Sequence, residues 1–128
     1  MAESPVEKRR KILIADDDRK TLSLLSEWLE REGYEVTSAT SGKDALRQAS
    51  SEAPDCMLLD LNMPQLDGYS LLLRLKENDR TSRIPIVILS TQPEDENQDI
   101  CRTFGPIQFV EKPFRIADVA CKVAHALT

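Results

Sequence analysis

The stretch Cys56-Met-Leu-Leu-Asp-Leu-Asn-Met-Pro-Gln-Leu-Asp-Gly68 decides the fold of this chain. Its apolar run, Cys56 to Leu59, is too short for a helix and predicts a strand that is buried on both faces. Asp60 follows directly, and Pro64 and Gly68 then redirect the chain, so the acid should lie where the strand's carboxyl end opens into a loop. Ligands bind at that edge in open parallel sheets. Taken alone, Asp60 is better explained as a solvated strand end, and the other stretches decide between the two interpretations.

The rest of the chain alternates short apolar segments with stretches of helical periodicity. Besides the strand at 55–60, the pattern predicts strands at residues 11–15, 34–38, 86–89 and 107–110, and helices at 21–32, 41–51, 68–77 and 114–127. Residues 92–104 are strongly acidic and offer only Ile100, Cys101 and Phe104 for burial, so any helix there should be short and weakly held. Such alternation indicates βαβ units, and therefore an α/β fold with a parallel sheet and helices on both faces.

Length, charge and cysteine content narrow the class of protein. At 128 residues the chain is one domain, with residues 1–10 as a polar, basic lead-in and 11–128 as the folded part. A net charge of -5 argues against direct binding to nucleic acid. The lead-in has no apolar segment behind it that could act as a signal peptide, and no stretch is long enough to span a membrane. With three cysteines, an odd number, we expect a cytoplasmic protein.

Charged or polar residues follow four of the five predicted strands. Because the carboxyl ends of parallel strands meet at one edge, these residues should converge there: Asp16, Asp17, Asp60, Ser90 and Lys112. Three neighbouring carboxylates repel one another, and burial would force a proton onto at least one of them unless a cation is present. Mg²⁺ fits because it prefers carboxylate and carbonyl oxygens and commonly bridges to phosphate.

The other two side chains of this set suit a phosphoryl group. Lys112 adds a positive charge and Ser90 a hydroxyl donor. Each residue in isolation is better explained as an exposed lysine or a strand-end hydroxyl, and only their combination with the acids points to a site. A carboxylate held beside Mg²⁺ can attack phosphorus and form an acyl phosphate.

Four motifs in this chain resemble those of the receiver domain of two-component response regulators. They are Ile-Leu-Ile-Ala-Asp-Asp-Asp (12–18), Leu-Asp-Leu-Asn-Met-Pro-Gln-Leu-Asp-Gly (59–68), Ile-Pro-Ile-Val-Ile-Leu-Ser (84–90) and Phe-Val-Glu-Lys-Pro-Phe (109–114). The resemblance runs from about Lys11 to Thr128. It implies a flavodoxin-like (βα)5 three-layer sandwich whose five-stranded parallel sheet has the order 2-1-3-4-5.

The resemblance also assigns the acids. It implies that Asp60 is both the phosphoacceptor and a ligand of Mg²⁺, and that Asp17 binds the ion directly. Asp16 would bind the ion partly through water, and the backbone carbonyl of Asn62 would complete the protein ligands. The phosphoryl donor would be a sensor histidine kinase or a histidine phosphotransfer protein, and the domain would catalyse only its own phosphorylation and dephosphorylation.

Further roles follow from the resemblance at the strand ends. Lys112 and Ser90 would bind phosphoryl oxygens, and Ser90 would shift on phosphorylation so that Phe109, the switch aromatic, turns inward. Pro113 would follow a cis peptide bond. The face made by residues 92–104, the fifth strand and the last helix would then change for an output partner, or for an output domain absent from this sequence.

The resemblance implies that three positions modulate how fast the phosphoryl group is lost: Asn62, Thr91 and Gln92. Thr91 departs from the alanine or glycine usual in the family and could narrow access to the acyl phosphate. Asp18 and Asp67 have no role in the family pattern and are expected to be solvated charges.

Two other functions remain open. A receiver-like module could bind partners without phosphorylation, although the complete acidic set and Lys112 weigh against it. A Mg²⁺-dependent phosphatase with an aspartate nucleophile would need a second aspartate two positions after Asp60 as acid and base, and that position is Asn62.

Overall fold

A single parallel sheet forms the centre of the molecule. The computed structural model describes residues 9–61, 68–91, 103–104 and 107–128. The strands are β1 (Lys11–Ala15), β2 (Glu35–Ala39), β3 (Cys56–Asp60), β4 (Ile86–Ser90) and β5 (Gln108–Glu111). All pairings are parallel and the order is β2-β1-β3-β4-β5. The predicted flavodoxin-like α/β fold is therefore confirmed.

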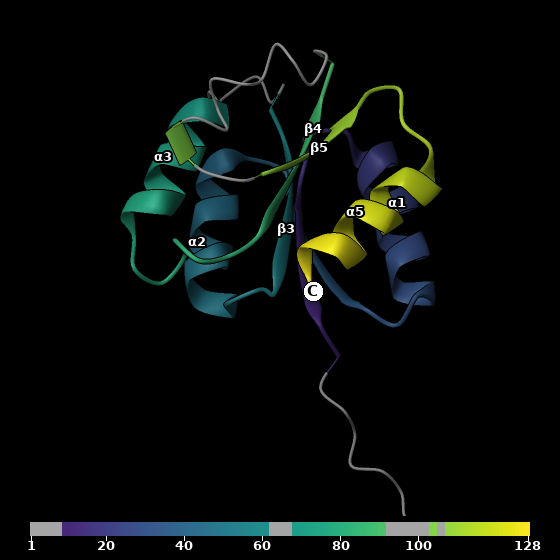
Figure 1. Ribbon diagram of the computed structural model, residues 1–128, viewed down its shortest axis with the longest axis horizontal. Coiled ribbons are helices and arrows are strands. Elements are labelled where there is room, and N and C mark those ends of the chain that lie inside the picture. The colour runs from purple at the N-terminus through teal and green to yellow at the C-terminus, as the bar shows by residue number, and fades with distance from the viewer. Residues whose placement is uncertain (1–8, 62–67, 92–102, 105–106) are drawn as a thin grey trace, which may run out of the picture.

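Helices cover both faces of this sheet. The described residues form α1 (Arg19–Arg31), α2 (Gly42–Glu52), α3 (Gly68–Glu77) and α5 (Ile116–Ala126). Figure 1 shows α2 and α3 on one side of the sheet and α1 and α5 on the other, which makes three layers. No helix in these described ranges is long and apolar enough to cross a membrane. Of the helix expected at 92–104, residues 92–102 lie outside the described residues.

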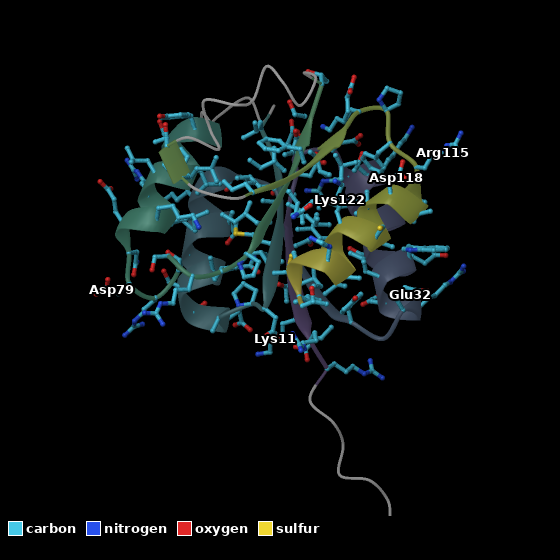
Figure 2. All side chains as sticks on the ribbon, viewed as in Figure 1. Lys11, Glu32, Asp79, Arg115, Asp118 and Lys122 are labelled. Atoms are coloured by element: carbon cyan, nitrogen blue, oxygen red, sulfur yellow. The ribbon has the colours of Figure 1, made fainter. Side chains whose placement is uncertain are left out.

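The central strands are apolar along their length because both of their faces are covered. Every residue of β3 is buried. Met57 and Leu59 belong to the apolar cluster that includes side chains of α2 and α3, whereas Cys56 and Leu58 belong to the cluster that includes those of α1 and α5. Figure 2 shows side chains between the sheet and both helical layers. Trp28, expected in the core, is partly buried against the second cluster.

The ends of α1 show where local chemistry shifted the predicted boundaries. The helix begins at Arg19 rather than Thr21, because the side chain of Asp18 accepts a hydrogen bond from the Lys20 N–H and caps it. Asp18, expected only as a solvated charge, therefore has a structural role. At the other end Gly33 has a φ of 97°, a conformation that glycine adopts without strain. The chain then enters β2 at Glu35, one residue later than predicted.

Candidate functional site

Strand register brings the predicted residues to one edge of the sheet. Ala15 of β1 pairs with Leu59 of β3, so the next residues along these strands, Asp16 and Asp60, emerge side by side. Ser90 ends β4, and Lys112 directly follows Glu111 of β5, which pairs with Ser90. Lys112 also donates its backbone N–H to the Ser90 carbonyl at 2.7 Å. The carboxyl ends of four strands thus supply the groups of a single site.

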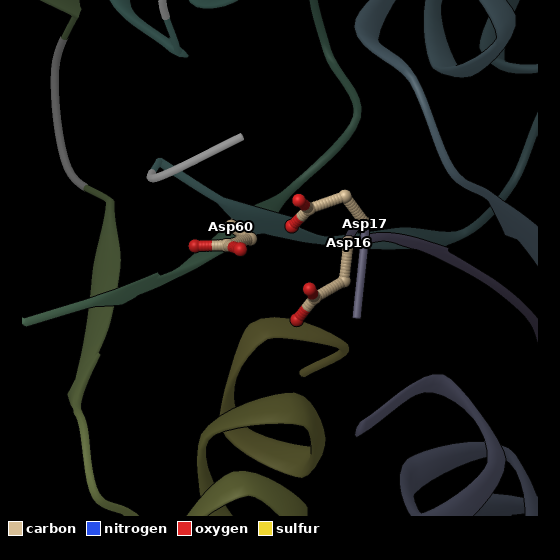
Figure 3. Close-up of side chains that lie close together, drawn as sticks. All are labelled: Asp16, Asp17 and Asp60. Atoms are coloured by element: carbon tan, nitrogen blue, oxygen red, sulfur yellow. The ribbon is translucent and has the colours of Figure 1, made fainter. Parts of the chain in front are cut away.

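Three aspartates form the acidic part of this site. Each of Asp16, Asp17 and Asp60 offers one oxygen atom, and these oxygens lie within 4.8 Å of one another (Figure 3). Asp16 and Asp60 are 0% and 2% exposed, whereas Asp17 is exposed. Two negative groups are therefore held largely out of water, and a third closes the cluster from the solvent side.

Lys112 neutralises part of this charge. Its Nζ atom lies 2.9 Å from Oδ1 of Asp60 and donates a hydrogen bond to it. The Asp60 side chain is 3% exposed and the Lys112 side chain 24%. Because ion pairs that are partly withdrawn from water are stronger than surface pairs, this contact fixes the position of one oxygen of Asp60.

Asp16 makes no such ion pair with the described residues. Its Oδ1 accepts a hydrogen bond from the Asp18 N–H at 2.9 Å, while its Oδ2 is buried and has no hydrogen-bond partner among the described residues. The pKa of Asp16 is raised to about 6, chiefly by burial and also by the negative charge of Asp60, against the lowering effects of the Asp18 N–H and of the Lys112 charge. The protein alone leaves this carboxylate under-compensated.

These features fit a divalent cation of the Mg²⁺ type. A hard ion bound to carboxylate oxygens would give the buried Oδ2 of Asp16 a partner and would remove the repulsion within the cluster. The donor set also suits the ion, because it consists of carboxylates without histidine or cysteine. Asn62, the predicted carbonyl ligand, lies outside the described residues.

The remaining predicted residues surround the cluster. Ser90 is buried at the end of β4, and Thr91 is exposed immediately after it. Phe109 is 5% exposed and already packs in the cluster with α2 and α3. The peptide bond between Lys112 and Pro113 is cis. Gln92 and Asp67 lie outside the described residues.

Comparison with known proteins identifies the family. The family model described as the response regulator receiver domain matches residues 12–124. This chain belongs to that family. Such receiver domains are parts of two-component regulatory systems.

Individual relatives agree with this assignment. The chain is 33% identical over 118 residues to the alkaline phosphatase synthesis transcriptional regulatory protein PhoP of Bacillus subtilis, with 92% of this chain and 48% of the relative covered. It is 34% identical over 117 residues to the transcriptional regulatory protein PrrA of Mycobacterium tuberculosis, with 91% and 49% covered. The receiver domain thus spans about half the length of these curated relatives.

Solved structures show the same architecture. The chemotaxis protein CheY4 of Vibrio cholerae superposes with a TM-score of 0.87 at 26% identity, covering 94% of this chain and all of that one. The receiver domain of the Francisella response regulator 1452 superposes with a TM-score of 0.83 at 32% identity, covering 93% and 97%.

One supporting residue of this receiver domain was missed from the sequence. Asp18 caps α1, and its backbone N–H also binds the buried carboxylate of Asp16. The Thr21 hydroxyl donates to Asp18 at 2.8 Å and is the main cause that lowers the pKa of Asp18, followed by the Lys20 N–H. The available signal was an aspartate directly before a helix, which was hidden in the run of three acids.

Proposed function

We propose that Asp60 of this receiver domain accepts a phosphoryl group from the phosphohistidine of a sensor kinase or a histidine phosphotransfer protein. The observation that carries the proposal is the Asp60 carboxylate, which is buried, paired with Lys112 at 2.9 Å and adjacent to two further carboxylates. An ion pair that served only to stabilise the fold would not need two further carboxylates beside it. Family membership and this geometry support the same chemistry.

The Asp60 carboxylate is the nucleophile in the proposed step. One of its oxygens attacks phosphorus, the new O–P bond forms, the N–P bond of the donor breaks, and the imidazole leaves with its electron pair and takes up a proton. Asp16, Asp17 and the Asn62 carbonyl would hold Mg²⁺, which supplies charge neutralisation for the phosphoryl oxygens. Lys112 exchanges its contact with Asp60 for a phosphoryl oxygen, and the Ser90 hydroxyl donates to another. Asn62, Thr91 and Gln92 would set how fast water later removes the group.

The signal would leave the site along β4 and β5. Ser90 lies two residues beyond Ile88, which pairs with Phe109 in the neighbouring strand. Since Phe109 is already inward in this structure, movement of Ser90 toward the phosphoryl group would hold the ring in that position rather than create it. The surface of β5 and α5, together with residues 92–104, would then present one conformation to an output partner or output domain.

The proposal also includes a cellular location and reasons against the two alternative functions. We place the domain in the cytoplasm, where the free cysteines Cys56 and Cys121 would stay reduced. Residue 62 is asparagine, so the domain lacks the acid and base that a phosphatase of this type needs for external substrates. In a module that works without phosphorylation, and so without Mg²⁺, nothing would explain why Oδ2 of Asp16 is buried without a hydrogen-bond partner among the described residues.

The test is an intact-mass measurement after incubation with acetyl phosphate and Mg²⁺. We expect one base-labile, acid-stable phosphoryl adduct in the wild-type protein, none in Asp60→Asn, and none without Mg²⁺. Asp79→Asn, which changes an exposed loop aspartate away from the site, is the matched control and should form the adduct normally. If wild-type protein forms no adduct and does not bind Mg²⁺, the domain works without phosphorylation; if Asp60→Asn is still modified, Asp60 is not the acceptor.

A further inference from the structure

A small cavity lies between α2 and α3 and shares no residue with the carboxylate cluster. Its volume is about 270 Å³, and its lining residues are Gly42, Lys43, Leu46, Leu71 and Arg74. Leu71 is buried and Leu46 half-buried, so these two side chains form an apolar floor. Lys43 from α2 and Arg74 from α3 are exposed and form the two rims. The two helices are neighbours on the same side of the sheet (Figure 1).

The rims carry positive charge that nothing nearby neutralises. Within the described ranges, neither Lys43 nor Arg74 makes an ion pair or a side-chain hydrogen bond. One turn along α2, Arg47 is by contrast paired with Asp44. The chain as a whole carries a net charge of -5. Two unpaired cations on either side of one apolar cavity therefore make a local site that attracts anions on an acidic protein.

The size and surroundings of the cavity favour a small molecule over a protein partner. Pockets for drug-sized ligands have volumes of about 300–1,000 Å³, so this cavity accepts a smaller apolar group. A protein interface would need a larger apolar patch around it. The exposed large hydrophobic residues of the described part are Leu24, Tyr69 and Leu73, and none of them lines the cavity.

We propose that this cavity binds a small organic anion. The apolar end of the ligand lies on Leu46 and Leu71, and its carboxylate lies between the ammonium group of Lys43 and the guanidinium of Arg74. Because the contact area is small and both cations are solvated, the dissociation constant of a ligand of about twelve non-hydrogen atoms is on the order of 1 mM. The site is independent of the phosphorylation chemistry proposed above.

The experiment uses 4-phenylbutyrate as the probe and follows backbone amide signals of the ¹⁵N-labelled protein by NMR. We expect saturable shifts centred on Lys43, Leu46, Leu71 and Arg74. 4-Phenylbutylamine has the same apolar body with the opposite charge and should bind at least about fivefold more weakly. The double variant Lys43→Gln/Arg74→Gln should weaken binding of the anion by a similar factor. Lys122→Gln removes a cation from α5, on the far side of the sheet, and should leave it unchanged (Figure 2).

Each outcome decides the proposal. Unchanged amide signals outside the cavity, together with normal phosphoryl adduct formation, show that the double variant remains folded. The proposal is overturned if 4-phenylbutyrate shifts no cavity amide at about ten times the expected dissociation constant. Equal binding of the amine would also overturn it, because the cavity would then recognise only the apolar body. Equal loss of binding in Lys122→Gln would show that only net charge matters.

Discussion

The two edges of the central sheet treat their polar groups in opposite ways. At the amino edge, Asp55 accepts a hydrogen bond from the Lys11 N–H at 2.7 Å and donates its own N–H to the Lys11 carbonyl at 2.8 Å. Thr81, in the connection that leads into β4, is 0% exposed, and its hydroxyl donates to the Leu75 carbonyl at 2.6 Å. Each of these polar groups joins segments of backbone and stabilises the fold.

At the carboxyl edge the buried carboxylate of Asp16 is left under-compensated. Asp16 keeps one oxygen without a partner among the described residues, and Asp60 shares its site with two other acids. This arrangement lowers the stability of the metal-free fold, because burial removes water from the carboxylate and no bound cation replaces it. Aspartate therefore has two roles in this sheet. At the amino edge Asp55 stabilises the fold through hydrogen bonds, and at the carboxyl edge Asp16 keeps an oxygen that a ligand could bind.

The largest effect is expected from Asp16→Asn, which removes the unfavourable charge. Because the pKa of Asp16 in the folded state, about 6, lies above the ordinary aspartate value of 3.8, the metal-free protein loses stability as pH rises from about 4 to 6 and regains none above. At pH 7.5 the variant should be more stable than metal-free wild type by about 3 kcal/mol, because the pKa rises from 3.8 to about 6 and each pKa unit corresponds to about 1.4 kcal/mol. Urea unfolding in EDTA at several pH values measures this.

The same variant should lose affinity for Mg²⁺, and wild-type affinity should fall as pH drops below about 6, because protons compete for Asp16. Hydrogen bonds lower the pKa values of Asp18 and Asp44, so these residues stabilise the fold above the ordinary aspartate pKa of 3.8 and lose that effect only in more acidic solution. They therefore do not obscure the window between pH 4 and 6. If Asp16→Asn is less stable than wild type in EDTA at pH 7.5, the contrast between the edges is wrong.

The second effect is expected at the amino edge, from Thr81→Val. This change keeps the shape of the side chain but leaves the Leu75 carbonyl without its hydroxyl donor, and it should lower the free energy of unfolding by about 1–2 kcal/mol. Thr37→Val is the control, because Thr37 is half-buried in β2 and its hydroxyl makes no hydrogen bond within the described part of the chain. The measurement is urea unfolding. If both valine variants change the free energy of unfolding equally, the hydrogen bond of Thr81 does not stabilise the fold.

The smallest effect is expected from Asp55→Ala. It removes the hydrogen bond to the Lys11 N–H, but both residues lie close to water, which replaces the lost partner, so the cost should be about 0.5–1 kcal/mol. Hydrogen exchange should speed up at the Lys11 amide and leave the amides in the middle of β3 unchanged. A fully unchanged Lys11 amide would show that the 2.7 Å contact contributes nothing.

The fold and the acidic site were predictable because their signals are local. The apolar run from Cys56 to Leu59 has no polar residue, which requires cover on both faces, and four of the five predicted strand ends are marked by an acid, a hydroxyl or a lysine. The parallel sheet then brings those ends together without any further information. Boundaries were accurate to two residues where a cap or a glycine was readable.

What escaped prediction depends on tertiary contacts. Thr81 is an ordinary polar residue in a polar connection, and only the packing of the α3 to β4 segment shows that it is buried and bonded to Leu75. Phe109 is buried in this structure among neighbours that come from distant parts of the chain, whereas its expected response to phosphorylation stays a prediction. Neither fact leaves a trace in local periodicity.

The pair formed by Asp60 and Lys112 also has a consequence for biosynthesis. The two residues are 52 positions apart, so a ribosome that adds roughly 5–20 residues per second makes the acceptor about 3–10 seconds before the lysine. A nascent or truncated chain can carry all three acids and still lack the cation that orders them. If Asp60 is the acceptor, as proposed above, phosphoryl transfer would therefore require a chain whose synthesis has passed β5 and reached Lys112.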